Sequence, residues 1–452
     1  MKTGVKWLAG TAILVLLGAS GAGGQAQREY ERKAEEYNAY QDIGRTQDLK
    51  QRLEVIDAFL KTYPQSAYRV YVYGAQLETA YAAQDYARAM QAADAFLAMN
   101  KQDVLSVWKQ GNANVEMAAL DPAYYRFNLL YTISFLQSFR EGETNADQIA
   151  ARAAERAVQA LEVHERLWSA AKPPQGMTAE QFGLMKKQEE ISLHTALAYV
   201  AWRNKDYPKA GREYKWLLER APDDARLNYQ LALALLRQTT PDYPQGVWYL
   251  ARAIRQNIPK AEEVKDYLTK VIATHQQVEL QCLGDQVTQL VARSGESVNP
   301  PADWKLINGE QVNAVRAEMN LKRIFDDLKA GGETAQMMFL ASCGAEIGLA
   351  ENGQPDLEVL IIEVAQTPEN SVTLRVAAGQ EAADAKSANI EIKVIEPADL
   401  KNLKNEDVVR IAGKIRGFQS EPFLLQLAEG KVNVEDIPKT RGRTGQGARG
   451  SR

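Results

Sequence analysis

The residues that most often do chemistry are scarce in this chain of 452 residues. Its three histidines, His164, His194 and His275, lie far apart in the sequence, and only two cysteines are present. No HExxH, paired Cys-x-x-Cys or acidic calcium-loop motif occurs, so no metal site is expected. No Gly-x-Ser-x-Gly elbow occurs, and neither cysteine has a candidate base near it in sequence. The sequence therefore predicts a chain without a catalytic, cofactor-binding or metal-binding site.

Two weaker signals have simpler explanations. A Gly-x-Gly-x-x-Gly match at Gly445, Gly447 and Gly450 lies in a basic tail with no strand before it and no helix after it, so it does not predict dinucleotide binding. His194 stands among apolar residues in SLHTALAYVAW and is expected to pack within a helical layer. Glu189-Glu190, shortly before it, is interpreted as the solvated start of a helix.

The N-terminus has the pattern of an export signal. Lys2 and Lys6 precede the apolar run WLAGTAILVLL, and the small residues GASGAGGQAQ follow. A charged lead, an apolar core of about 7–15 residues and a small-residue exit describe a secretory signal peptide, predicted here over residues 1–26. The run is short for a membrane span of about 20 residues, and an uncleaved anchor is the alternative. We therefore expect an exported chain, periplasmic or extracellular, that is not an integral membrane protein.

Export also decides how the two cysteines are interpreted. An oxidising compartment favours a disulfide between Cys282 and Cys343. Two buried free thiols are the alternative, because the sequence alone does not show whether the two Cα atoms approach each other. The sequence leaves both states open.

From residue 27 to residue 293 the chain has the apolar spacing of successive helices. One local pattern recurs at Asp85-Tyr86, Asp206-Tyr207 and Asp242-Tyr243. The residues three, seven and ten after each tyrosine are small or mostly apolar: Ala89, Ala210 and Gly246; Ala93, Tyr214 and Leu250; Phe96, Leu217 and Ala253. An aspartate turn that starts a second helix, followed by a small residue one turn later, lets two helices lie close together. The pattern predicts antiparallel helix pairs.

These segments resemble tetratricopeptide repeats, which are arrays of helix pairs about 34 residues long. Asp242 follows Asp206 by 36 residues, and Asp48 precedes Asp85 by 37. Pro64 and Pro222 fall where a repeat-closing proline is expected. The chain departs from the family where Arg52 takes a small-residue position, where Lys101 replaces the closing proline, and over residues 103–203, which are expected to keep the repeat only loosely.

In tetratricopeptide repeats the first helix of each pair lines a concave groove. Carried onto this chain, the groove face includes Tyr71, Glu78 and Tyr81; Tyr199, Trp202 and Arg203; and Arg226, Tyr229 and Arg237. Tyrosine, tryptophan and arginine are enriched at binding hot spots, so the resemblance implies a protein or peptide ligand. The alternative is that these aromatic side chains pack between neighbouring repeats.

The pattern changes after residue 293. Residues 294–336 are predicted as a linker, with Pro300-Pro301, and one helix, AVRAEMNLKRIFDDLKAGG, ending at Gly331-Gly332. Residues 337–438 contain five strand-like runs, DLEVLIIEVAQT, SVTLRVAA, NIEIKVIEP, DVVRIAGKIRGF and FLLQLAEGKVNV, with a short helix in PADLKNL. Residues 439–452 are predicted to be a disordered basic tail.

The order of these runs resembles the OB-fold, a small β-barrel. The segment VVRIAGKIRGFQSEPFLLQL resembles the last hairpin of OB-like domains in exported bacterial proteins. The expected fold class is therefore mainly α, a tetratricopeptide-like solenoid of helical pairs, followed by a small OB-like barrel.

Charge disfavours a nucleic-acid ligand. The formal net charge is −4, residues 356–438 hold 15 acidic and 9 basic residues, and the only aromatic residues there are Phe418 and Phe423. A nucleic-acid site needs a positive groove with exposed aromatic rings. The sequence favours an exported protein- or peptide-binding scaffold without catalytic activity. The alternative is an exported enzyme, for example a carbohydrate-active one, whose two carboxylates lie about 5–10 Å apart without forming a motif.

Overall fold

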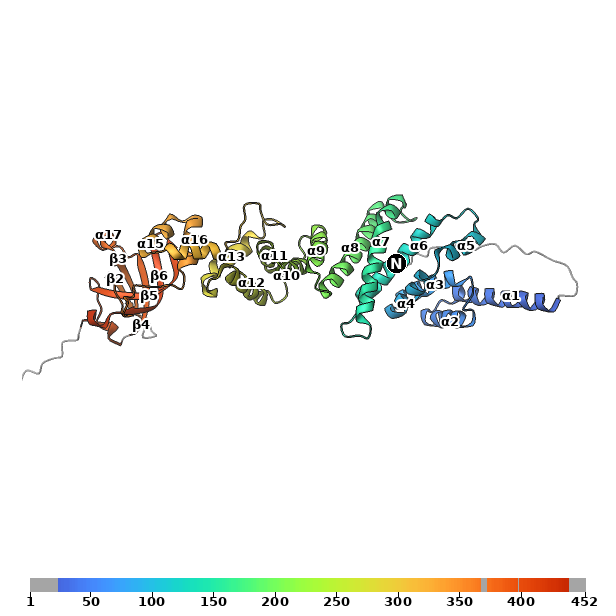
Figure 1. Cartoon of the computed structure of the whole chain (residues 1–452), viewed down its shortest axis with the longest axis horizontal. Coiled ribbons are helices and arrows are strands. Elements are labelled where there is room, and N and C mark those ends of the chain that lie inside the picture. The colour runs from blue at the N-terminus through green and yellow to red at the C-terminus, as the bar shows by residue number, and fades with distance from the viewer. Residues whose placement is uncertain (1–22, 367–371, 397, 439–452) are drawn as a thin grey trace, which may run out of the picture. The chain divides into compact units, whose positions relative to one another are not determined.

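The computed structural model describes residues 23–366, 372–396 and 398–438 (Figure 1). Most of the predicted signal peptide and the whole predicted tail over 439–452 lie outside these residues. The chain divides into two compact units, Met1–Pro222 and Asp223–Arg452. Among the described helices, none combines the length and apolarity that a membrane span needs.

The first unit is a series of helices packed in consecutive pairs. They are α1 (Gly23–Arg45), α2 (Leu49–Thr62), α3 (Arg69–Ala82), α4 (Tyr86–Leu97), α5 (Lys101–Gly111), α6 (Asp121–Ser138), α7 (Ala146–Ala170), α8 (Ala179–Arg203) and α9 (Tyr207–Arg220), with a short 3₁₀ helix η1 (Met117–Leu120) before α6. The pairs are α1–α2, α3–α4, α6–α7 and α8–α9, and each packs on the next through α2–α3, α4–α6 and α7–α8. The expected array of helical pairs is confirmed in this unit.

Each predicted turn contains an aspartate that caps the second helix of a pair. Its side chain accepts a hydrogen bond from the backbone N–H three residues on. The bonded pairs are Asp48–Gln51, Asp85–Arg88, Asp206–Lys209 and, in the second unit, Asp242–Gln245. This bond satisfies one of the N–H groups that a helix leaves without a partner at its start. The aspartates therefore fix where each second helix begins.

The small residues after these caps lie in the seam between the two helices. Ala89 and Ala210 are 0 % exposed, and a Cβ atom added to Gly246 would lie 2.6 Å from Leu236 Cγ. The positions four and seven residues further on share the same helix face and are also buried: Ala93, Tyr214 and Leu250; Phe96, Leu217 and Ala253. The predicted phase of these second helices is confirmed.

Residues 103–203 keep the pairing but lose the aspartate cap. Asn145, before α7, has a left-handed backbone (φ 66°) and makes no side-chain cap bond. The helices α7 and α8 are each 25 residues long. Between the pairs, α6 is buried on most sides because α3, α4, α7 and α8 all pack on it. Its nearly continuous apolar sequence follows from that central place.

The second unit begins with further helices. They are α10 (Ala225–Leu236), α11 (Tyr243–Arg255), α12 (Ala261–Gln276), α13 (Gly284–Arg293), α14 (Gly309–Glu318), α15 (Leu321–Ala330) and α16 (Gly332–Ser342), with η2 (Leu280–Cys282) before α13. α10 packs on α11, and α12 packs on both α11 and α13.

The single helix predicted from Ala314 to Gly332 is wrong. The backbone is extended at Met319 (ψ 142°), and Asn320 starts a new helix by accepting a hydrogen bond from the Arg323 N–H. The sequence pattern suggested one helix because its apolar spacing continues across this cap. A further helix, α16, follows Gly331 and was not predicted.

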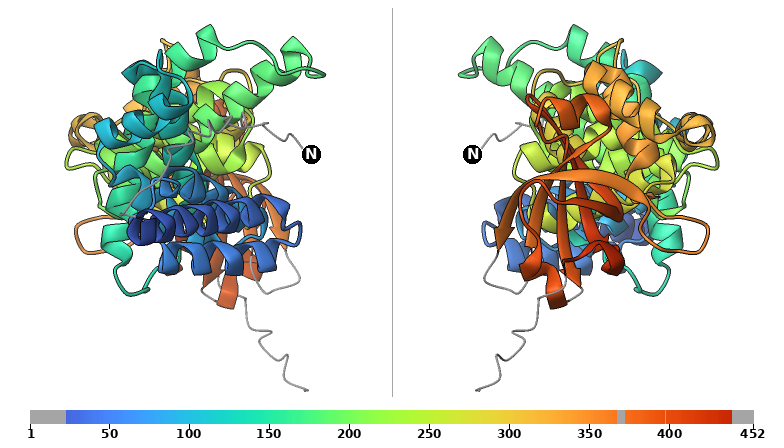
Figure 2. Two further views of the ribbon diagram at one scale, coloured as in Figure 1. Left: turned by 90° about the vertical axis from the view of Figure 1, so that its right-hand side faces the viewer. Right: turned by 90° about the vertical axis from the view of Figure 1, so that its left-hand side faces the viewer.

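Six strands follow: β1 (Glu346–Ile347), β2 (Leu357–Gln366), β3 (Val372–Ala378), β4 (Ile390–Glu396), β5 (Val408–Ser420) and β6 (Phe423–Val432), with α17 (Gln380–Asp384), η3 (Ala398–Asn402) and η4 (Val434–Asp436). Five strands close into a barrel in the order β5–β2–β3–β4–β6–β5, and β1 pairs with β5. The β4–β6 pairing is parallel and the other pairings are antiparallel. Figure 2 (right) shows the curved strands. The predicted small C-terminal β-barrel is confirmed, and its likeness to the OB-fold stays a prediction.

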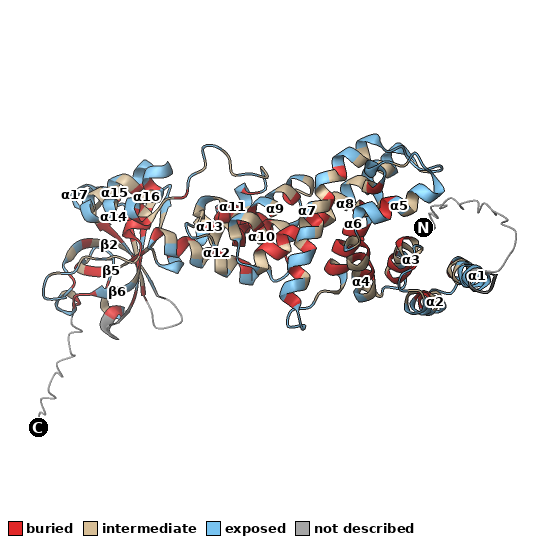
Figure 3. Cartoon of the chain, turned by 45° about the vertical axis from the view of Figure 1, so that its right-hand side comes forward, coloured by how far each residue is buried: buried red, intermediate tan, exposed pale blue. Residues whose placement is uncertain are grey.

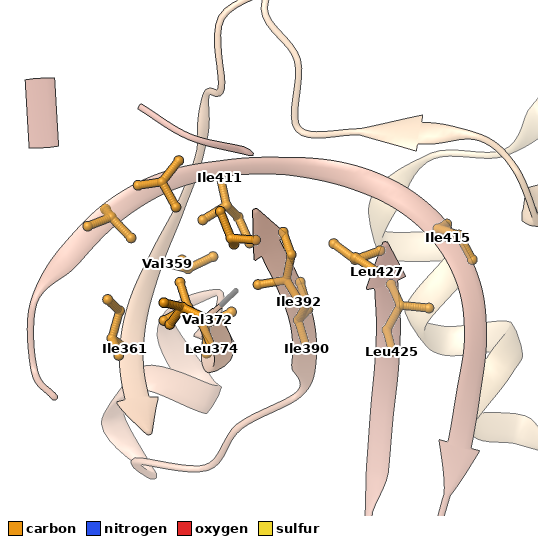
Figure 4. Close-up of a cluster of buried hydrophobic side chains, with 14 of the residues drawn as sticks. Val359, Ile361, Val372, Leu374, Ile390, Ile392, Ile411, Ile415, Leu425 and Leu427 are labelled. Carbon is orange, nitrogen blue, oxygen red and sulfur yellow. The ribbon is translucent and has the colours of Figure 1, made fainter. Parts of the chain in front are cut away.

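The barrel interior is a packed apolar core (Figure 4). Its residues include Val359, Ile361, Val372, Leu374, Ile390, Ile392, Ile411, Ile415, Leu425 and Leu427, and α15 and α16 add Ile324, Leu328, Ala335 and Met338 to the same cluster. Gly430 allows the close β4–β6 approach, because a Cβ atom there would lie 2.5 Å from Ile392 Cγ1 and 2.7 Å from the Lys393 carbonyl oxygen.

A disulfide joins the helical part of the second unit to its barrel part. Cys282 of η2 is bonded to Cys343, the residue after α16, and their Cα atoms lie 6.0 Å apart. Beside it, Glu279 forms a 2.8 Å ion pair with Arg416 of β5. The predicted domain boundaries after residues 293 and 336 stay predictions; α13 ends at Arg293, and α16 runs across residue 336.

Replacing Ala210 with leucine should destabilise the α8–α9 seam. Ala210 is fully buried, so added carbon atoms must displace neighbours, at a cost of roughly 1–3 kcal/mol in the free energy of unfolding. Urea unfolding measures the change, and Ala87→Leu at an exposed position of α4 is the matched control. Equal stability of Ala210→Leu and wild type would contradict the seam assignment.

Candidate binding surfaces on the first helices

The predicted groove residues lie on the first helices of three pairs. Tyr71, Glu78 and Tyr81 are on α3; Tyr199, Trp202 and Arg203 are at the end of α8; Arg226 and Tyr229 are on α10, and Arg237 is the residue after it. Glu78, Arg226 and Arg237 are exposed, Tyr199 and Trp202 are half-buried, and the remaining side chains are also intermediate. Intermediate exposure fits both a groove and packing between repeats, so the groove stays a prediction.

On α3 the two predicted tyrosines are near aromatic or basic neighbours. The Tyr71 ring lies 6.3 Å from Tyr40 of α1, and the Tyr81 ring meets Tyr86 edge-on at 6.0 Å. Burial raises the pKa of Tyr81, and the positive charge of Arg126 opposes that rise. Arg126 is an exposed residue of α6 that the sequence pattern missed, because the repeat phase is lost in residues 103–203.

On α8, two of the three predicted residues make internal bonds. The Tyr199 hydroxyl donates to Glu141 at 3.0 Å. Arg203 donates through Nε to Glu141 and forms a 2.7 Å ion pair with Asp147. Glu141 lies in the turn between α6 and α7, and Asp147 lies in the first turn of α7. Tyr199 and Arg203 therefore connect the end of α8 to this region. The Trp202 ring packs edge-on against Tyr207 at 5.3 Å.

In the second unit, Tyr229 and Tyr243 lie near Tyr267 of α12. Burial raises the pKa of Tyr267. The positive charge of Arg237 opposes this rise, and the phenols of Tyr229 and Tyr243 add to it. Tyr243 also stacks on His275 of α12 at 4.4 Å, and burial lowers the pKa of His275. The repeat pattern did not select Tyr267 or His275 of α12 as surface residues, because the turn after α12 lacks the aspartate–tyrosine signal that marked the other pairs.

A partly buried polar cluster, Tyr125, Trp168 and Glu189, lies between α6, α7 and α8 and corrects one interpretation. Glu189 is in the middle of α8, not at a solvated helix start, because Thr178 and Gln181 form the capping box that begins this helix. The Tyr125 hydroxyl donates to Glu189 at 2.6 Å, and Trp168 donates to the Tyr125 oxygen at 3.4 Å. Burial raises the pKa of Glu189. The capping box was the readable signal that places Glu189 in the helix interior.

The two histidines of the first unit are packing residues. His194 Nδ1 lies 2.6 Å from Glu213 Oε2, and its ring stacks on Trp216 at 3.6 Å. His164 is buried, and its burial lowers its pKa. Within the described ranges, no group of three or more His, Cys, Asp or Glu side chains could hold a metal ion.

Aromatic and basic side chains of the barrel are engaged within the fold. Phe418 and Phe423 pack against Phe339 and Phe325 of the preceding helices, each pair at 5.6 Å. Basic side chains of the strands form ion pairs: Arg375 with Glu363 and Glu391, Lys414 and Arg416 with Glu429, Arg410 with Asp436, and Lys431 with Glu346. These aromatic and basic groups already serve the fold.

The chain matches no known sequence family and no curated protein. Among solved structures it matches the "TPR2AB-domain:pHSP90-complex of yeast Sti1" at 14% sequence identity, over 61% of this chain and 100% of that chain, with a TM-score of 0.15. A match this weak carries no argument. The tetratricopeptide-like assignment rests on the caps, the seams and the helix pairing described above.

Glu189→Gln should stabilise the protein at neutral pH. Because burial raises the Glu189 pKa in the folded state, the native chain holds this proton more tightly than the unfolded chain, and stability falls as pH rises between the unfolded and folded pKa values. Glutamine keeps an acceptor for Tyr125 without the charge. Thermal melting at a series of pH values should show a higher midpoint for the variant at pH 8.

The difference should shrink as the pH falls toward about 4.5, the ordinary glutamate range. Glu190→Gln, one residue along the same helix, is the matched control. An unchanged or lowered midpoint for Glu189→Gln at pH 8 would contradict the assigned cost of the buried charge.

Proposed function

We propose that this chain is an exported scaffold that binds a protein or peptide along the first helices of its helical pairs and catalyses no reaction. Partly covered aromatic side chains on the first helices carry the proposal. Second helices place their periodic side chains in the buried seam. First helices keep Tyr71, Tyr81, Trp202 and Tyr229 only partly covered. Partly covered aromatic rings are the usual anchors of protein-binding hot spots.

Export to the periplasm or the extracellular space is part of the proposal. It rests on the charged lead and apolar run that precede residue 27. The bond between Cys282 and Cys343 fits an oxidising compartment, where disulfides persist. The bacterial origin implied by the last barrel hairpin is proposed on the same footing.

An exported enzyme is the alternative function, and the described residues give it no specific support. Glu189, whose raised pKa is the kind seen in catalytic acids, accepts a hydrogen bond from the Tyr125 hydroxyl inside a helix seam. A nucleic-acid ligand is also disfavoured, because the basic side chains on the barrel are paired with acids.

Two tryptophans of adjacent helices provide a matched test. Trp202 is on the first helix α8 and Trp216 is on the second helix α9, and both are half-buried. The mature chain with either Trp202→Ala or Trp216→Ala serves as bait for cross-linked capture from the envelope fraction, with the melting temperature measured in parallel. We expect Trp202→Ala to lose the captured partner while it stays folded, and Trp216→Ala to retain it.

Capture that survives in folded Trp202→Ala, also when Arg203→Ala is added, would contradict a groove on α8. The same preparations test export. The chain should be recovered from the envelope with its N-terminus between about residues 20 and 28, and recovery with Met1 intact would contradict a cleaved signal.

A further inference from the structure

Four tyrosine rings meet where α1 and α3, two successive first helices, lie side by side. Tyr40 of α1 stacks on Tyr68, the residue before α3, at 4.7 Å. Tyr37 meets Tyr68 at 6.1 Å, and Tyr71 of α3 meets Tyr40 at 6.3 Å. We call Tyr37, Tyr40, Tyr68 and Tyr71 the tyrosine cluster. Of these four tyrosines, only Tyr71 is among the groove residues predicted from the repeat pattern.

The cluster has a packed side and an open side. Tyr40 and Tyr68 pack against the apolar cluster that contains Ile43, Ile56, Phe59 and Val72, whereas Tyr37 and Tyr71 do not belong to it. The Tyr37 side chain is 40% exposed, and Figure 3 shows α1 as largely exposed. One side of the cluster therefore packs on the apolar core of α1, α2 and α3, and the other side is accessible to solvent.

The phenol groups are available as hydrogen-bond donors. In the part of the chain that the structure describes, no hydrogen bond from the four hydroxyls to a protein group is formed. Burial raises the pKa of Tyr40, Tyr68 and Tyr71 above the ordinary value, so these phenols keep their protons at neutral pH. The Nε of the nearby Arg69 donates a hydrogen bond to the Ser66 carbonyl oxygen.

We propose that the tyrosine cluster binds a proline-rich segment of the partner in the polyproline II conformation. This rests on the proposed function of the helical pairs as a peptide-binding surface and names the ligand class for one part of it. Proline-rich segments dock in aromatic-lined grooves, where pyrrolidine rings pack against aromatic faces. A polyproline II chain has no internal hydrogen bonds, so its carbonyl groups are free to accept bonds from tyrosine hydroxyls.

The spacing of tyrosines on α1 fits this ligand. Tyr30 precedes Tyr37 by seven residues on α1 and is 62% exposed, so the two lie on nearly the same helix face. Seven residues of α-helix rise about 10 Å, and one turn of polyproline II, three residues, rises roughly 9 Å. Successive turns of the ligand can thus meet Tyr30 and Tyr37 in sequence.

The chemistry of the cluster favours this ligand over two others. A strongly acidic peptide would be repelled by the carboxylate of Glu36, whose charge helps to raise the pKa of Tyr68, and the four rings themselves are neutral phenols. An oligosaccharide can also stack on tyrosine, but recognition of its hydroxyls uses fixed polar side chains such as carboxylates, amides or guanidinium groups, which these four residues do not supply. A rigid proline-rich chain also loses little conformational freedom on binding.

Decaproline is the probe, titrated into the mature full chain by isothermal titration calorimetry, with a ten-residue Gly-Ser peptide as the ligand control. We expect saturable binding of decaproline only. Tyr37→Ala combined with Tyr71→Ala should weaken decaproline binding roughly tenfold or more, the loss typical of hot-spot aromatic residues. The double variant should stay folded, because neither ring belongs to the apolar core. Tyr40→Phe, which removes only a hydroxyl, should weaken binding less while the fold is retained. Val158→Ala, at an exposed apolar position of the second helix α7, should not change it.

Absence of decaproline binding, or equal binding by the Tyr37→Ala, Tyr71→Ala variant, would overturn the proposal. Binding of cellohexaose at the cluster in place of decaproline would assign it to sugars and overturn it as well. Partner capture that depends on Trp202 but not on Tyr37 and Tyr71 would leave the scaffold function standing and contradict only this ligand assignment.

Discussion

The capped turn between paired helices is the constraint on which the repeat array depends. In four of the turns an aspartate carboxylate accepts a hydrogen bond from the N–H three residues on, at Gln51, Arg88, Lys209 and Gln245, and so fixes the first residue of α2, α4, α9 and α11. Once that start is fixed, the small residue one turn later must face the first helix, as Ala210 and Gly246 do. The remaining seam positions follow from helical periodicity.

Filling the seam from the second helices has a consequence for function. The first helices are left with side chains that are only partly covered, and in this chain many of those are tyrosines. The proposed recognition through aromatic rings and phenol donors needs no histidine, cysteine or metal, so it is compatible with a chain that is poor in reactive residues. In the second unit, the disulfide and the Glu279–Arg416 ion pair hold the closed barrel to the helices before it.

Periodic features could be predicted from the sequence, and features set by interruptions could not. The caps at Asp85, Asp206 and Asp242, the seam residues and the five barrel strands all follow from local patterns that the fold preserves. The helix break at Met319-Asn320 was missed because apolar spacing continues across it. Glu189 was misread because its burial depends on Tyr125, which is 64 residues away in the sequence.

The residues of the proposed binding surfaces were the least predictable part. Tyr71 could be selected from the repeat phase, but Tyr37, Tyr40 and Tyr68 belong to α1 and to the residue before α3, where no repeat signature marks them. Arg126 and Tyr267 lie on first helices whose turns lack the aspartate–tyrosine signal. Their placement depends on how neighbouring helices pack, and a periodic pattern within one helix carries no information about its neighbour.

The free energy of unfolding of cap variants tests the central claim most directly. Asp206→Ala should lower it by about 0.5–2 kcal/mol, because an N-terminal N–H of α9 loses its acceptor, whereas Asp206→Asn, which retains an acceptor oxygen, should stay close to wild type. Glu219→Ala, an exposed position on the same helix, controls for the loss of a negative charge. If Asp206→Ala and Glu219→Ala unfold with the same free energy as wild type, the aspartate turn does not set the helix pairs, and the account is wrong.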